Sequence, residues 1–288
     1  MNRTNVIATN TLVLGGTGKT GSRVAQRLTQ RGWPVRIGSR SGEPAFDWQD
    51  PATWKPALRH INAVYITFQP DLAVPGAVDT IRSFAETAVE SGVRKLVLLS
   101  GRGEVAAELC EQAVRQSDVD WTILRASWFN QNFSESYLLE PVLAGYVALP
   151  VKDVGEPFID ADDIAEVAVA ALTEPGHAGQ LYELTGPRLL TFAEAVGEIA
   201  GATGRPIQYE SVSMAAYAAE LVEQDVPDEY VALLTYLFTE VLDGRNASLT
   251  DSVERVLGRK PTDFADYARR TAATSIWGVG AAFSKETA

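Results

Sequence analysis

Short apolar runs alternate with helical repeats of apolar residues along the first half of the chain. The apolar runs predict strands at residues 12–14, 34–38, 63–68, 95–99 and 121–124. Helical spacing predicts helices at residues 22–30, 75–90 and 103–116, and Asp50 before Pro51 predicts one more helix start. Strands that alternate with helices in this way form parallel, right-handed βαβ units, and their sheet is buried on both faces. We therefore expect an α/β fold with a doubly wound parallel sheet of the Rossmann type.

The pattern is less regular after about Ala126. The expected elements there are strands at residues 158–160, 181–184 and 207–212, a helix at 162–172, a helix that opens at the capping box of Thr191 and Glu194 and reaches Ala202, and helices from Ser213 to the end. We predict a Rossmann domain at residues 1–150 and a smaller, mostly helical part at residues 151–288. This second part should cover the open edge of the sheet and return some elements to it.

Composition narrows the possible partners. The chain has 288 residues, of which 46% are hydrophobic and 22% charged, which is typical of a globular protein. A formal net charge of −12 argues against nucleic acid or an anionic membrane as the main partner. One cysteine and two histidines exclude an internal disulfide and disfavour a metal site, and Cys110 is expected to be a buried, small apolar residue.

Targeting signals are not visible in the sequence. The first ten residues lack the apolar stretch of a signal peptide. No apolar window approaches the ~20 residues that a membrane-spanning helix needs. We therefore expect a cytoplasmic protein.

A glycine-rich run follows the first predicted strand and opens the first predicted helix. Such glycines let the backbone turn tightly and approach a pyrophosphate, while the helix N-terminus offers N–H groups to the phosphates. A P-loop would need a glycine five positions before Gly18, where Val13 stands, so nucleotide hydrolysis is disfavoured. The run therefore predicts a dinucleotide site, with these cofactor-binding residues: Gly15, Thr17, Gly18, Lys19, Thr20 and Gly21.

The end of the second predicted strand bears on the choice of dinucleotide. A carboxylate at this place binds the ribose hydroxyl of NAD, but the chain has Ser39, Arg40 and Ser41 there. Arg40 can bind a 2′-phosphate bidentately, and Lys19 is a second candidate. The alternative is that Arg40 is only a solvated loop charge. We predict NADPH/NADP+ as the cofactor.

Ligands of such sheets lie beyond the carboxyl ends of the strands. Further cofactor-binding candidates at these ends are Thr67, Phe68, Gln69, Ser100, Gly101 and Arg102. Substrate-binding candidates after the fifth strand are Trp128, Phe129, Asn132 and Phe133, and each of the aromatic residues can equally be part of the core.

Several motifs resemble the NmrA-like atypical short-chain dehydrogenases. They are the glycine run and residues 98–100, 121–125, 128–133, 162–165 and 257–261, and together they span nearly the whole chain. Residues 18–20, 39–42 and 100–104 are most similar to the ergot-alkaloid iminium reductase branch, of the agroclavine and festuclavine type. The resemblance implies an NADPH-dependent reductase, with residues 1–150 binding NADP and residues 151–288 binding the substrate.

The chain departs from ordinary members of that family in one respect. They carry Tyr-x-x-x-Lys on the helix after strand four, whereas residues 104–116 contain neither tyrosine nor lysine. Ser100 and Glu104 are the catalytic candidates that remain, with Ser100 positioning the substrate. An acceptor that needs little proton donation, such as an iminium, an imine or a quinone-like molecule, fits this absence.

The charge of the acceptor and the class of protein remain open at this point. Glu104 or Asp160 can favour a cationic substrate by charge complementarity, unless each is solvated or paired with Arg102 or Arg125. Some NmrA-like proteins are non-catalytic redox sensors, and the missing pair fits that alternative too. We expect a small-molecule substrate, flat and apolar or cationic, and a monomer or homodimer.

Overall fold

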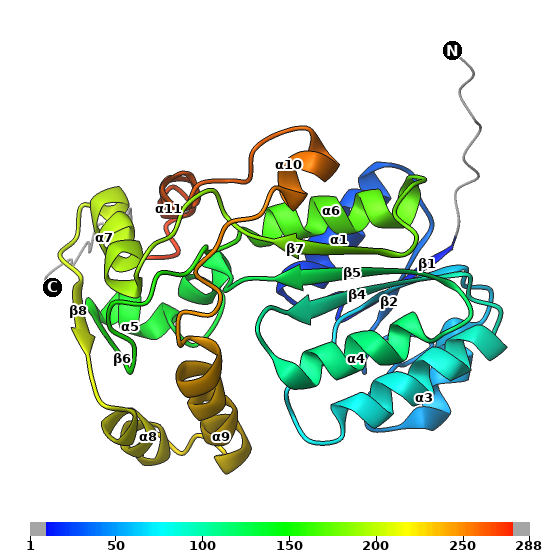
Figure 1. The fold of residues 1–288 in the computed structure, drawn as a ribbon, viewed down its shortest axis with the longest axis horizontal. Coiled ribbons are helices and arrows are strands. Elements are labelled where there is room, and N and C mark those ends of the chain that lie inside the picture. The colour runs from blue at the N-terminus through cyan, green and yellow to red at the C-terminus, as the bar shows by residue number, and fades with distance from the viewer. Residues whose placement is uncertain (1–9, 279–288) are drawn as a thin grey trace, which may run out of the picture. The chain divides into compact units, whose positions relative to one another are not determined.

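The computed structural model describes residues 10–278. Six strands form one parallel sheet in the order β2-β1-β3-β4-β5-β7 (Figure 1). Their bounds are β1 Thr11–Leu14, β2 Val35–Gly38, β3 Ala63–Ile66, β4 Lys95–Gly101, β5 Asp120–Ala126 and β7 Gln180–Leu184. The α/β fold with a doubly wound, Rossmann-type sheet is therefore confirmed.

Helices cover both faces of this sheet. Figure 1 shows α3 (Ala77–Glu90) and α4 (Val105–Arg115) on one face, with α1 (Lys19–Gln30) and α6 (Ala161–Thr173) on the other. Successive strand side chains point to opposite faces. Leu12 and Leu14 accordingly join the core cluster beneath α3 and α4, whereas the equally buried Val13 between them does not. Burial on both faces explains why the strands read as continuous apolar runs.

Two predicted details of these elements are also confirmed. The Asp50 side chain accepts a hydrogen bond from the Ala52 N–H and caps a 3₁₀ turn, Pro51–Thr53, that leads into α2 (Trp54–Leu58). Cys110 on α4 is fully buried, and burial raises the pKa of its thiol to about 12. A thiol in this state is an apolar packing group.

The chain forms two compact units whose boundaries differ from a single division at residue 150. Among the described residues, unit 1 comprises residues 10–127, 161–185 and 250–261, and unit 2 comprises residues 128–160, 186–249 and 262–278. The elements that return to unit 1 are α6, β7 and α10 (Ser252–Leu257). β7 returns to the sheet by pairing in parallel with β5, in agreement with the expectation that the second part returns some elements to the sheet.

Unit 2 is built around aromatic side chains. Its elements are the 3₁₀ helix η2 (Asn130–Phe133), α5 (Leu139–Ala144), β6 (Tyr146–Leu149), α7 (Phe192–Thr203), β8 (Gln208–Ser211), α8 (Met214–Glu223), α9 (Asp228–Tyr236), the π-helix η3 (Leu237–Val241) and α11 (Phe264–Ala272). The capping box of Thr191 and Glu194 is present at the start of α7, as expected.

The strand expected at residues 207–212 is confirmed as β8, and helices follow Ser213 as expected. One other expectation for this region is wrong, and some fall outside the described residues. Residues 158–160 form no strand, because Ile159 makes only one isolated bridge, to Phe129. The pairing of β6 with β8 in a second, two-stranded sheet was not expected. Residues 1–9, which hold most of the N-terminal tail, and residues 279–288, the end of the expected helical region, lie outside the described part. Within residues 10–278, no helix has the length and apolar character needed to span a membrane.

Candidate functional site

The turn between β1 and α1, which we call the glycine turn (residues 15–21), depends on glycine for its geometry. Gly15 has a φ of 60°, in the left-handed region, and its carbonyl accepts a hydrogen bond of 2.8 Å from the Gly18 N–H. A Cβ at Gly15 would overlap Thr67 Oγ1, and a Cβ at Gly21 would overlap the carbonyl of Gly15. The turn therefore lies close against the carboxyl end of β3. This is where the strand order changes direction next to β1.

The start of α1 is suited to an anion. Gly18 is its N-cap residue and supplies no capping side chain, and the first turn contains no acidic residue. The partial positive charge of the helix N-terminus therefore faces the glycine turn without a neutralising carboxylate. Thr17 is exposed, Lys19 is half-buried and Thr20 is buried. These features fit the pyrophosphate of a dinucleotide.

Arg40 lies in the loop after β2 with an exposed side chain. Among residues 10–278 it has no hydrogen-bond or ion-pair partner. The hydroxyls of Ser39 and Ser41 lie 3.4 Å apart beside it. A cation flanked by two hydroxyls in this loop fits a phosphate monoester.

The segment after β3 forms another wall of this edge. Thr67 Oγ1 donates to the carbonyl of Leu14, at 3.0 Å, and so ties β3 to the strand before the turn. Gln69 Nε2 lies 3.8 Å from the place that a Cβ on Gly18 would take. Phe68 packs against Trp48, with ring centroids 5.0 Å apart. The structure thus brings Thr67 and Gln69 to the glycine turn, while Phe68 faces an aromatic neighbour.

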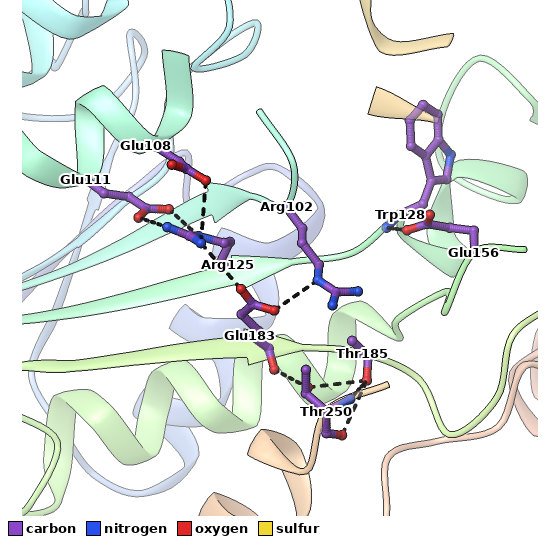
Figure 2. Close-up of polar contacts among 9 residues, drawn as sticks. All are labelled: Arg102, Glu108, Glu111, Arg125, Trp128, Glu156, Glu183, Thr185 and Thr250. Carbon is purple, nitrogen blue, oxygen red and sulfur yellow. Dashed lines mark hydrogen bonds and ion pairs between the residues drawn. The ribbon is translucent and has the colours of Figure 1, made fainter. Parts of the chain in front are cut away.

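Arg102 belongs to a network of charged groups in unit 1 that Figure 2 shows, and the Ser100 hydroxyl joins this network through Glu111. The Ser100 hydroxyl donates to Glu111 Oε1 at 2.6 Å, and Arg125 Nε donates to the same oxygen at 2.8 Å. Arg125 also pairs with Glu183 at 3.4 Å, and Glu183 accepts from Arg102 Nε at 3.1 Å. Because its proton is directed at a carboxylate, the Ser100 hydroxyl is held in one orientation.

Sequence reasoning missed the two glutamates that organise this network. Glu111 lies in the middle of α4 and is almost fully buried, and Glu183 lies on β7. Neither position stands out in the sequence. An inward-facing acid in an otherwise apolar helical stripe was the one available signal for Glu111.

Glu104 is a buried carboxylic acid. Its pKa is raised to about 9, mainly by burial and then by the charge of Asp71, a hydrogen bond with Asp71 and the charge of Glu111. Its carboxyl group occupies the space that a Cβ on Gly101 would need. The raised pKa favours the protonated, neutral form of Glu104 near pH 7, and so disfavours the expected role of Glu104 as a negative charge for a cationic substrate.

Asp160 is committed to structural contacts within unit 2. It is fully buried, accepts a hydrogen bond of 2.8 Å from Gln131 Nε2, and pairs with Arg270 Nη2 at 2.5 Å. The sequence left open that Asp160 is paired with an arginine, and the structure shows such a pair. The arginine that the structure shows paired with Asp160 is Arg270.

The aromatic candidates after β5 have different environments. Phe133 is fully buried, with its ring against Phe158 at 5.8 Å and Phe264 at 5.5 Å, so it lies in the core of unit 2. Phe129 and Asn132 are half-buried. The backbone N–H of Trp128 donates to Glu156 Oε1 at 3.1 Å, and Figure 2 shows the indole pointing away from that carboxylate.

Sequence comparison gives the chain close relatives. A model of the NmrA-like family matches residues 108–268. The chain is 33% identical to the uncharacterized oxidoreductase YesF of Bacillus subtilis, over 92% of this chain and 97% of the relative. It is 30% identical to the NAD(P)H azoreductase of Xenophilus azovorans, over 91% and 98%. It is 31% identical to agroclavine dehydrogenase of Claviceps fusiformis, over 89% and 95%.

Solved structures share the fold. The NADPH-dependent quinone oxidoreductase of Escherichia coli, complexed with NADPH, has a TM-score of 0.76 at 20% identity, with 91% of this chain and 99% of that chain covered. NmrA, a negative transcriptional regulator in complex with NAD, has a TM-score of 0.71 at 15% identity, with 94% and 98% covered. The resemblance that the sequence motifs indicate is confirmed, including the similarity to clavine dehydrogenases.

Proposed function

The chain belongs to the NmrA-like family, and we propose that it is an NADPH-dependent reductase that transfers a hydride to a small-molecule acceptor. The observation that carries this proposal is the glycine turn beside the exposed cation of Arg40. The names of the relatives, an azoreductase, a dehydrogenase and an oxidoreductase, support redox chemistry.

The residues of unit 1 divide the cofactor between them in this proposal. The glycine turn and the N-terminus of α1 hold the pyrophosphate, and Arg40 with Ser39 and Ser41 holds the 2′-phosphate. Thr67, Gln69, Gly101 and Arg102 line the strand ends where the rest of the dinucleotide would lie. When bound, NADPH supplies the hydride.

The acceptor we propose is an iminium, an imine or a quinone-like molecule. Helix α4 carries no tyrosine or lysine, and the Ser100 hydroxyl is directed at Glu111. A cationic C=N group becomes a neutral amine on receiving a hydride, so it needs no proton from the protein. A neutral imine takes a proton from solvent to become the iminium before the transfer, and a quinone becomes a resonance-stabilised hydroquinone anion that takes its proton from solvent afterwards. The contribution of the chain is then to bring the two reactants together in the correct orientation.

The test is the oxidation of NADPH, followed by the absorbance of the reduced nicotinamide, against cyclic iminiums, quinones and ketones. We expect turnover with iminiums or quinones and none with ketones. Tight NADPH binding by calorimetry without turnover of any acceptor would contradict the proposal and favour a redox sensor. The chain shares its fold with NmrA, a transcriptional regulator in complex with NAD, and this is the reason for testing the alternative of a sensor.

A further inference from the structure

Five aromatic residues of unit 2 form a cluster that the proposed cofactor site does not use. We call Trp128, Tyr137, Phe192, Tyr217 and Phe238 the aromatic cluster. The Trp128 ring lies 5.8 Å from that of Phe192 and 5.6 Å from that of Phe238, and the Phe238 ring lies 5.4 Å from that of Tyr217. Tyr137 packs against the same core.

Two hydrogen-bond donors in this cluster are buried without an acceptor. The indole N–H of Trp128 and the hydroxyl of Tyr137 have no hydrogen-bond partner among residues 10–278. Most buried polar groups in proteins are paired, so two such groups in one cluster call for an explanation.

The two donor groups lie close to each other. The Trp128 indole lies close enough to Tyr137 to lower the pKa of its phenol, although the two groups form no hydrogen bond of normal geometry. Burial and the Tyr217 phenol outweigh this effect and hold the pKa of Tyr137 well above its ordinary value. Tyr137 therefore keeps its proton and remains a donor at any ordinary pH.

The surroundings of the donors select the kind of acceptor. Phe192 and Phe238 offer flat apolar faces and no hydrogen-bonding group. A site that disfavours the phenolate also disfavours a carboxylate or phosphate, because both are anions in an apolar environment. The matching group is an uncharged oxygen on a flat ring.

The segment that carries Tyr217 and Phe238 is lightly packed. Helix α8 buries only Tyr217, no residue of α9 is fully buried, and Phe238 lies on the π-helix η3. Single π-helical turns are frequent at functional sites. The segment that carries Tyr217 and Phe238 is therefore packed less tightly than the phenylalanine core around Phe133.

We propose that Trp128 Nε1 and Tyr137 Oη form a subsite that binds a carbonyl oxygen of a flat, uncharged aromatic acceptor. This inference rests on the proposed function in taking the ligand to be the hydride acceptor. It selects the quinone-like class from the alternatives. The two groups act as donors that hold the oxygen, and Tyr217 and Phe238 stack around the ring.

The experiment measures binding and not turnover. Calorimetry without NADPH compares the wild type with Tyr137→Phe and Trp128→Phe, using menadione as the carbonyl probe and N-methyl-dihydroisoquinolinium as a probe without an acceptor oxygen. We expect each variant to raise the Kd for menadione about tenfold, the effect of one hydrogen bond, and to leave the iminium unaffected.

A matched variant separates this role from ordinary packing. Tyr267 is a buried tyrosine of the same unit whose hydroxyl donates to Ser134 Oγ at 2.7 Å. Tyr267→Phe should lower the melting temperature and keep menadione affinity, whereas Tyr137→Phe should melt at or above the wild-type temperature and lose affinity.

Three results would overturn the subsite. They are no menadione binding by the wild type, menadione affinity within about twofold of the wild type in both cluster variants, or a loss of melting temperature in Tyr137→Phe like that of Tyr267→Phe. Menadione binding that depends on both donors, without any NADPH oxidation, would support the subsite while contradicting the proposed reductase function.

Discussion

The glycine turn of unit 1 and the aromatic cluster of unit 2 differ in whether water reaches their hydrogen-bond donors. At the turn, the start of α1 and the side chain of Arg40 lie at an edge that water reaches. In the cluster, the Trp128 and Tyr137 donors are buried and have no acceptor among the described residues. An exposed donor can hydrogen-bond to water when no ligand is bound, so it costs the protein little stability. A buried donor without an acceptor lowers the stability of the unliganded protein.

The two regions also differ in the length of chain that builds them. The turn is encoded within residues 15–21 and the strand and helix that flank them. The cluster draws on residues before α5, in α7, in α8 and in η3. Local sequence is therefore enough to recognise the first region, whereas the second exists only after unit 2 has folded.

The largest effect should follow from breaking the turn itself. Gly21→Ala places a methyl group against the carbonyl of Gly15, so the backbone at the pyrophosphate position must shift. We expect NADPH affinity, measured by calorimetry, to fall at least about 100-fold, or about 2.8 kcal/mol. The matched control is Gly197→Ala in α7, where an added Cβ meets no described atom within 4 Å. Equal NADPH affinities for both variants would refute the proposal that the glycine turn holds the pyrophosphate.

Changing the charge beside the turn tests the choice of dinucleotide. Arg40→Asp removes a cation proposed to bind the 2′-phosphate, and such charge-assisted bonds contribute about 1.5–3 kcal/mol. NADPH affinity should fall about 10- to 100-fold, while NADH affinity changes little. Arg59→Asp makes the same change of charge at another exposed arginine and should preserve the preference. An unchanged preference in Arg40→Asp would mean that this residue is only a solvated loop charge.

A smaller effect is expected at Ser100. Ser100→Ala removes the hydrogen bond to Glu111 but leaves the Glu111–Arg125 pair, with its distance of 2.5 Å. We expect kcat for a preformed iminium to fall less than about tenfold, because one neutral hydroxyl is lost. Complete loss of turnover with folding and NADPH binding intact would give the hydroxyl a direct part in the reaction.

A separate effect concerns stability as pH changes. The pKa of Glu104 is raised from 4.5 to about 9 in the folded state, so the folded protein keeps a proton that the unfolded chain has lost. This group therefore lowers the free energy of unfolding progressively as pH rises between those two values. Glu104→Gln stays neutral, and its melting temperature relative to the wild type should increase from pH 6 to pH 9.

A control for this titration lies on the same helix. Glu108 is half-exposed, so Glu108→Gln should show no comparable pH-dependent gain. A Glu104→Gln curve parallel to that of the wild type would show that Glu104 is ionised in the folded protein.

The sequence predicted the parts of the fold that depend on neighbouring residues. The strand, glycine turn and helix of residues 11–30 follow from apolar runs and helical spacing, and the capping box at Thr191 needs only Glu194. β6 was missed because its partner β8 lies far along the chain and the short pair has no clear alternation. Residues 158–160 were predicted as a strand because Phe158 and Ile159 are apolar. Ile159 makes only one isolated bridge, to Phe129, so no strand forms there.

The candidate site divides in the same way. Gly15, Gly21 and Arg40 were identified from local pattern, and their roles remain predictions until a cofactor is measured. The protonation of Glu104 depends on Asp71, which lies in the loop after β3, and the pairing of Asp160 depends on Arg270 in α11. Such long-range contacts decide whether a carboxylate carries charge, and the sequence does not reveal them.

The most direct test of the proposed function follows the hydride itself. NADPH deuterated at one face of the nicotinamide C4 is supplied with a cyclic iminium, and the amine product is analysed by mass spectrometry. The reductase proposal predicts that deuterium from one face, and not from the other, appears on the former iminium carbon. An amine product that carries no deuterium from either face would contradict direct hydride transfer.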